Sequence, residues 1–444
     1  TRYAYDLDKR LKQKTDSLEN SVSYVYDLLG NLTEEINARN ISVTYDYDRM
    51  NRLIKKNAPA ASGDMATTQY IYDVSGNLIQ QINPNEETSM KGMSYDYDSM
   101  NRLTVVYNPE GEGKRHIKYD NNGNIVKEVD GLRFTGDIDS SPGNLYEYDG
   151  LNRLVKSTDA AGNITAIEYD ILDNVTKSTD ARSNETIFEY NPDRTLANAT
   201  FADNGTIRYQ YDSLGRMTKQ TDQNGNTTEF KYNAWSKQES IEDACGNVQE
   251  FKYDLAGNMV TYKDQLGSIT KFKYDGNNRL AEKRIPLEEI GSGNYHYYIE
   301  KYVYDETGNI LSQTVTGTKE PLSRRITNYA YYPDGSLRET IHSSGSNVRY
   351  YYDRNGNLTG TESLRENGIY DITRYEYDIE NRMTASIQLV DEDSILTEEI
   401  NNISELIDSE YSDRIMAITS FEYDLLGNRT KIISPKAYGC TDTE

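Results

Sequence analysis

The chain has 444 residues and a net charge of −24, and it is rich in tyrosine (39 residues) but poor in proline (9), histidine (3) and tryptophan (1). No cluster of Lys and Arg opposes this charge, so the composition argues against a nucleic-acid partner and against an anionic membrane surface. No stretch approaches the ~20 apolar residues of a membrane-spanning helix, so we expect no membrane insertion. The two cysteines, Cys245 and Cys440, are too few for a disulfide framework or a metal site.

From its first residues onward the chain repeats one short module that starts at a tyrosine. The clearest copies read Tyr-Asp-x-x-Gly-Asn-Leu, and a variant with Asn-Arg in place of Gly-Asn starts at Tyr47, Tyr97, Tyr148, Tyr274 and Tyr377. From Tyr148 to Tyr274 the interval is 21 residues six times in succession. A fixed short period indicates a repeat architecture. The key tyrosines that we assign are 5, 26, 47, 72, 97, 119, 148, 169, 190, 211, 232, 253, 274, 304, 332, 352, 377 and 423.

Each module is predicted to form a β-hairpin. A second aromatic residue two positions before the key tyrosine, such as Phe230 before Tyr232, places both rings on one face of a strand. The Asp-x-x-Gly-Asn that follows is typical of a turn, because Asp bonds its own downstream backbone and Gly or Asn accepts a positive φ. A second strand then begins at the Leu, for example over residues 32–36. The structural repeat positions that we single out are Tyr26, Asp27, Gly30, Asn31, Tyr72, Asp73, Gly76, Asn77, Tyr211, Asp212, Tyr253, Asp254, Gly257, Asn258, Tyr352, Asp353, Gly356 and Asn357.

Eighteen hairpins give about 36 strands, which at ~4.8 Å spacing make a ribbon about 170 Å long that must curl. We therefore expect an all-β fold in which tandem hairpins form a long curled sheet, the wall of a spiral shell. We expect one body over residues 1–433 and a tail at 434–444. Irregular spacing marks insertions at 54–69, 127–145, 281–299, 311–330 and 384–420.

The last insertion contains the one amphipathic pattern of helical spacing. Leu396, Ile400, Ile403 and Ile407 follow each other at intervals of four, three and four residues, with an N-cap at Asp393 or Ser394. This predicts a short helix, which either packs against the shell wall or acts as a plug or docking helix.

Residues that could carry chemistry are sparse, and each has a structural alternative. Residues 222–226 resemble a calcium loop, but the Gly stands at the fourth position instead of the sixth and no bidentate Glu follows, which favours turn capping. His116, His296 and His342 lie in separate repeats beside tyrosines and loop residues. Trp235 replaces a turn residue and either packs locally or stacks on a sugar. We therefore expect no catalytic residue, no metal and no cofactor.

The Tyr-Asp-x-x-Gly-Asn-Leu and Tyr-Asp-x-x-Asn-Arg-Leu units resemble YD repeats, the module of bacterial Rhs and wall-associated proteins, Tc-toxin B/C components and animal teneurins. The resemblance covers about residues 3–429. It implies a spiralling ribbon of β-hairpins that forms a hollow shell, which in some members holds a C-terminal toxin and in others acts in adhesion. Members that release a toxin carry an Asp-Pro-x-Gly motif near the junction. None of the nine prolines here follows an aspartate, so no self-cleaving aspartates can be carried over.

Two functions follow from these patterns. The first is a non-catalytic, extracellular or cell-surface shell segment that encloses or presents a C-terminal effector domain of the parent chain, and the resemblance implies a bacterial source. The alternative is a surface adhesion or carbohydrate-binding module with glycans as partners. An enzyme within the repeat is not expected, since a catalytic carboxylate pair needs a unique site.

Overall fold

A computed structural model describes residues 1–291, 294–319, 324–365, 368–391 and 415–433. They form one antiparallel sheet of 36 strands, and the described helical structure is the short 3-10 helix η1. The all-β fold of tandem hairpins is therefore confirmed. The elements are β1 (Arg2–Tyr5), β2 (Leu11–Thr15), β3 (Ser21–Tyr26), β4 (Leu32–Ile36), β5 (Ser42–Tyr47), β6 (Leu53–Pro59), β7 (Met65–Tyr72), β8 (Leu78–Ile82), η1 (Pro84–Glu86), β9 (Met93–Tyr97), β10 (Leu103–Tyr107), β11 (Gly113–Tyr119), β12 (Ile125–Asp130), β13 (Asn144–Tyr148), β14 (Leu154–Thr158), β15 (Ile164–Tyr169), β16 (Val175–Thr179), β17 (Glu185–Tyr190), β18 (Leu196–Thr200), β19 (Thr206–Tyr211), β20 (Met217–Thr221), β21 (Thr227–Tyr232), β22 (Gln238–Glu242), β23 (Val248–Tyr253), β24 (Met259–Lys263), β25 (Ile269–Tyr274), β26 (Leu280–Gly291), β27 (Asn294–Tyr304), β28 (Ile310–Gly317), β29 (Arg325–Tyr331), β30 (Leu337–His342), β31 (Asn347–Tyr352), β32 (Leu358–Leu364), β33 (Tyr370–Tyr377), β34 (Met383–Asp391), β35 (Ile415–Tyr423) and β36 (Arg429–Ile433).

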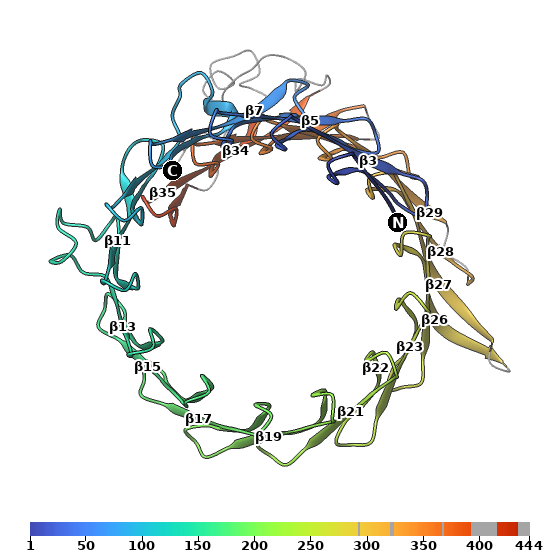
Figure 1. The fold of residues 1–444 in the computed structure, drawn as a ribbon. Coiled ribbons are helices and arrows are strands. Elements are labelled where there is room, and N and C mark those ends of the chain that lie inside the picture. Colours follow the sequence, from blue (N-terminus) through green and yellow to red (C-terminus); the bar gives the residue numbers. More distant parts are fainter. Residues whose placement is uncertain (292–293, 320–323, 366–367, 392–414, 434–444) are drawn as a thin grey trace, which may run out of the picture. The chain divides into compact units, whose positions relative to one another are not determined.

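Strands that follow each other in the chain lie side by side (Figure 1). Within a hairpin the register slips by one residue just before the key tyrosine, so that Val25 pairs with Glu34 but Tyr26 pairs with Leu32. The same bulge recurs from β1–β2 to β35–β36. Each odd-numbered strand ends in a turn that starts at the residue after the key tyrosine, which we call a YD turn. Where the structure describes it, the turn after an even-numbered strand is called a connecting turn. Because neighbouring strands are antiparallel, the described YD turns lie at one end of the strands, which we call the YD edge. The described connecting turns lie at the opposite end, which we call the connecting edge.

The insertions lengthen hairpins and leave their strands in the sheet. Strands β6 and β7 extend as far as a turn at 60–64, and β26 and β27 have 12 and 11 residues. β28 and β29 lengthen in the same way, and β12 is followed by a loop that leads into β13. The helix predicted at 393–407 and the tail at 434–444 lie outside the described residues.

Most side chains in the described strands are half-buried, as expected for a single sheet whose two faces are both partly open to solvent. In β17, Phe188 and Tyr190 are half-buried while the residues that alternate with them are exposed. The one cluster of buried side chains among the described residues joins Ile372, Ile387 and Leu389 with Ala385 and Ile415, on β33–β35. Stability along the rest of the sheet must therefore come from contacts between neighbouring strands and turns.

The chain divides into two compact units. Unit 1 contains residues 1–114, 300–316 and 322–444, and unit 2 contains residues 115–299 and 317–321. The single body expected over residues 1–433 stays a prediction. Within unit 1, early repeats lie against late ones (Figure 1), and hydrogen bonds join residues 266–294 positions apart.

Candidate functional site

The YD turn is held by its aspartate. The Asp27 Oδ1 atom accepts hydrogen bonds from the backbone N–H groups of Leu29 and Asn31 (2.9 and 2.8 Å), and its Oδ2 atom accepts one from the Asn31 side-chain amide (2.9 Å). Gly30 has a φ of +92°, so the third position after the aspartate favours glycine. These bonds, led by the one from the Asn31 amide, lower the pKa of Asp27 and keep it ionised.

The key tyrosine joins each hairpin to the one before it. The Tyr26 hydroxyl donates to the backbone carbonyl of Leu11 (2.9 Å), the first residue of the second strand in the preceding hairpin. The same bond, 2.7–3.0 Å long, is made by Tyr47, Tyr72, Tyr97, Tyr148, Tyr169, Tyr190, Tyr232, Tyr253, Tyr274, Tyr331, Tyr377 and Tyr423. The sequence gives the tyrosine's position but not this bond, because the acceptor belongs to another repeat.

The Asn-Arg variant reproduces the same turn with different atoms. Asn51 takes the place of the glycine with a φ of +62°, and the Arg52 Nε atom donates to Asp48 Oδ2 (2.7 Å) as the Asn31 amide does to Asp27. The arginine also reaches forward. Its Nη1 atom donates to the carbonyl of Asp73 (2.8 Å) in the next YD turn, and its guanidinium lies 4.7 Å from the centroid of the Tyr72 ring.

Gly-Asn turns make a forward contact of their own. The Asn31 amide donates to the side-chain oxygen of Asn51 (3.1 Å), and Asn77 contacts Asn101 in the same way (3.0 Å). Consecutive YD turns are thus linked along the edge. The alternation of Gly-Asn with Asn-Arg in the sequence is the signal for this link, which sequence reasoning missed.

The other repeat positions have matching geometry. Asp73 accepts from the backbone of Ser75 and Asn77 (both 2.8 Å), with Gly76 at φ +94°. In the later copies, the side-chain amides of Asn258 and Asn357 donate to Asp254 and Asp353 (3.0 and 2.9 Å), with Gly257 and Gly356 in the left-handed region. In the remaining copy, Arg216 Nε donates to the Asp212 carboxylate (2.7 Å). Burial raises the pKa of the key tyrosines of these copies, Tyr72, Tyr211, Tyr253 and Tyr352.

One key tyrosine was placed wrongly from the sequence. Tyr331, not Tyr332, makes the bond to the preceding hairpin, to the carbonyl of Ile310 (2.9 Å). Tyr332 occupies the position of the turn aspartate, and its N–H donates to the Ser336 carbonyl. Two adjacent tyrosines leave the sequence register ambiguous by one residue, and that shift reverses which side chain faces which side of the sheet.

In unit 1, connecting turns of early repeats dock against YD turns of late repeats, and we call this contact the seam. Arg39 donates to the carbonyls of Tyr332 and Pro333 (both 3.2 Å) and lies 3.8 Å from the Asp305 carboxylate. The Lys114 ammonium donates to Glu380 (2.6 Å). The carboxylates of Asp305 and Glu380 are almost fully buried, so both cations neutralise charges removed from water.

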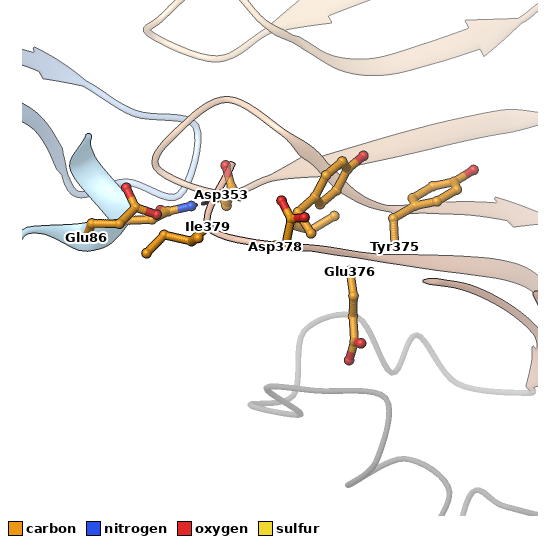
Figure 2. A pocket seen from close by; sticks show the side chains of 9 residues that line it. Glu86, Asp353, Tyr375, Glu376, Asp378 and Ile379 are labelled. Atoms are coloured by element: carbon orange, nitrogen blue, oxygen red, sulfur yellow. Dashed lines mark hydrogen bonds between the residues drawn. The ribbon is translucent and has the colours of Figure 1, made fainter. Parts of the chain in front are cut away.

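The centre of the seam is η1 with the turn at 353–357. The Asn85 backbone N–H donates to Asn355 Oδ1, and its side-chain amide donates to Asp353 Oδ2 (both 2.9 Å). A cavity of about 420 Å³ opens here (Figure 2), lined by Asn85, Glu86, Asp353, Thr359, Tyr375, Glu376, Tyr377, Asp378 and Ile379.

Glu86 is the unusual residue of this cavity. It reaches from η1 towards the turn with Asp353 (Figure 2), is only 7% exposed, and its Oε2 atom has no hydrogen-bond partner. Burial raises the pKa of Glu86, and the negative charge of Asp353 adds to this, while hydrogen bonding from Asn355 and the charge of Arg354 oppose it. The hydrogen bonds from Asn85 to the turn at 353–357 join an early repeat to a late one at this cavity.

The remaining candidate residues have local partners. His116 stacks on Phe134 with centroids 3.5 Å apart, His296 Nδ1 is 3.1 Å from the Thr318 carbonyl, and His342 is 3.1 Å from the Thr327 hydroxyl. Asp222 caps its turn by accepting from the backbone of Asn224 and Asn226, as turn capping requires. Trp235 is 67% exposed and Cys245 is also exposed; Cys440 is outside the described residues.

Within the described ranges, no three His, Cys, Asp or Glu side chains are grouped so as to hold a metal ion. No helix in that part of the chain has the length and apolar character needed to cross a membrane.

The architecture of these hairpins defines a class of protein, a YD-repeat shell. A family model for the teneurin YD-shell matches residues 61–280, and one for the RHS repeat matches residues 5–41 and 26–62. The chain therefore belongs to the YD-repeat family. No curated protein matches its sequence.

Among solved structures, the chain is similar to the TcdB2-TccC3-TEV crystal structure, with 13% identity and a TM-score of 0.38, and to the Photorhabdus luminescens Tc holotoxin pore with the TccC3-D651A mutation, with 13% identity and a TM-score of 0.35. Each match covers 98% of this chain and 32% of the other, so the chain spans about a third of the length of these relatives.

Proposed function

We propose that this chain is a non-catalytic segment of an extracellular YD-repeat shell that encloses or presents a C-terminal effector domain of its parent chain. The observation that carries the proposal is the seam, where Arg39, Asn85 and Lys114 bind turns 266–294 residues further on. A wall that surrounds a cargo needs contacts between successive layers, and side chains that only cap turns or join layers have no catalytic task. The family match to a YD shell supports the same role.

The experiment begins with the coding sequence beyond Glu444. A downstream domain unrelated to the repeat is expected, and in the purified longer protein it should resist protease while the shell is intact. Replacing Arg39 and Lys114 together by Ala should open the seam and expose that domain, whereas Arg49→Ala, at an exposed YD turn, should not. Equal protection in all three proteins, or a chain that continues only as repeats and an anchor, contradicts the proposal.

A second function, binding of surface glycans, has one observation in its favour. Trp235 is 67% exposed at the tip of a YD turn, and an exposed indole can stack on a sugar face. It is the only tryptophan of the chain, so its fluorescence reports on that site alone. Quenching by a glycan panel supports this function, and unchanged fluorescence across the panel contradicts it. The aromatic rows inside the strands are half-buried and favour a packing role instead.

A further inference from the structure

Five YD turns of unit 2 carry large apolar side chains at their tips, and between the first and the last of them only the turn at Asn191, with Pro192 and Asp193, does not. These apolar side chains occupy the first or second position after the residue that begins each turn, and Ile171 and Leu255 are each 95% exposed. Since YD turns follow every second strand, neighbouring turns lie about 10 Å apart along the edge. These apolar residues, which we call the apolar tips, are Leu151, Ile171, Leu172, Leu214, Trp235 and Leu255.

In unit 1 the late part of the same edge is covered, whereas the tips of its early YD turns are exposed and apolar, as Leu7, Leu28 and Val74 show. The YD turns that begin at Asp305, Tyr332, Asp353 and Asp378 receive connecting turns of earlier repeats at the seam. The tip positions of these four turns are mostly polar, and they include Asn355, which accepts from Asn85, and Glu380, which accepts from Lys114. The YD edge of this fold is therefore a surface that binds a connecting edge, and where it does so within the chain its tips match polar partners.

The connecting edge of unit 2 is also exposed, and four of its turns carry alanine near the tip. Its turns and loops carry exposed small residues and two exposed large apolar side chains, Leu132 (56% exposed) and Leu266 (95% exposed). The small residues are Ala161, Ala181, Ala202 and Ala244. Connecting turns follow every second strand as well, so both edges have the same spacing of about 10 Å. Large tips on one edge can then enter the spaces between small-residue turns on the other.

We propose that the YD edge of unit 2 binds the connecting edge of unit 2 in a second copy of this chain. The contact joins two different edges, as the seam does, so it is head-to-tail and can continue into a stack of copies. The six apolar tips expose roughly 800 Å² together, about the area that each partner contributes to a standard interface. The net charge of −24 opposes association, so the contact strengthens with salt.

Sedimentation velocity at rising protein concentration tests this, at about 0.15 M and at higher salt. The sedimentation coefficient should rise with concentration, and more steeply at higher salt. Ile171→Asp with Leu255→Asp should abolish the rise by placing charges on the YD edge. Leu266→Asp with Ala202→Asp should abolish it from the other edge. The matched control is Ile187→Asp, which changes an exposed aliphatic residue on a sheet face and should leave association unchanged. Circular dichroism confirms that each variant keeps its fold.

Mixing the two double variants separates a head-to-tail contact from a symmetric one. Each variant retains one intact edge, and these two edges are complementary, so the mixture should form a one-to-one complex that grows no further. Association of the YD-edge variant by itself would overturn the proposal, as would association of the connecting-edge variant by itself. A wild-type chain that stays monomeric at every concentration and salt also overturns it. None of these outcomes depends on whether the chain encloses an effector.

Discussion

The hydrogen bond from each key tyrosine to the preceding hairpin should contribute about 1 kcal/mol to the free energy of unfolding. The substitution Tyr253→Phe measures this contribution. The Tyr253 hydroxyl donates to the Gln238 carbonyl at 2.9 Å, and burial of the ring raises the pKa of this tyrosine, so the bond lies in a partly dehydrated place. Phenylalanine keeps the ring and removes only the hydroxyl donor, so Tyr253→Phe should lower the free energy of unfolding by about 0.5–1.5 kcal/mol. Tyr253→Ala also removes half-buried ring contacts and should cost roughly 2 kcal/mol or more.

The assay is urea unfolding followed by circular dichroism, combined with hydrogen exchange at the amides of β22 and β23. In a repeat protein the loss should appear at the two hairpins that the bond joins, because each repeat contacts only its neighbours. Tyr5→Phe is the control, since Tyr5 is 60% exposed in the first hairpin of the chain. The reasoning is refuted if Tyr253→Phe matches the wild type, or if it costs as much as Tyr253→Ala.

Three further predictions concern the turns and the seam. Gly257 has a φ of +88°, so Gly257→Ala should cost about 1 kcal/mol in urea unfolding while Gly257→Asn costs less, because asparagine takes this place at Asn278; equal losses would contradict this. Arg39→Ala removes the guanidinium that lies 3.8 Å from the buried Asp305 carboxylate and donates to the carbonyls of Tyr332 and Pro333, so it should destabilise unit 1 by about 2 kcal/mol, with no change in the hydrogen exchange of unit 2; a uniform change would count against the seam. Burial raises the pKa of Glu86 above its usual 4.5, so its protonated form stabilises the fold fully below pH 4.5, and this contribution is lost as pH rises through the raised pKa; Glu86→Gln should therefore gain stability relative to the wild type towards neutral pH, and a difference that does not vary with pH would refute it.

Local repeat structure could be predicted from the sequence because each hairpin is specified by residues close together in the chain. Asp27, Gly30 and Asn31 form their turn without help from elsewhere, so the pattern predicts both the turn and the strand that starts at Leu32. Even degenerate copies keep the turn, with Lys9 and Arg194 at positive φ in place of the glycine. Where two tyrosines are adjacent, at Tyr331 and Tyr332, local pattern cannot fix the register, and the bond to Ile310 decides it.

The seam could not be predicted because its partners are far apart in the chain and belong to different copies of one motif. Asp353 and Asp254 read identically in sequence, and both cap their own turn, yet Asp353 also binds Asn85 of an early repeat. The covered YD turns carry mostly polar residues in the two positions that the repeat leaves free, as in Arg354 and Asn355, whereas exposed turns carry either apolar residues, as in Leu255, or polar ones, as in Asn121. The residues that the copies of the module share therefore specify the hairpin. Residues at the positions that differ between copies, such as Asn355 and Glu380, add contacts to other repeats at the seam. Partner choice in this chain should be sought at those variable turn positions first.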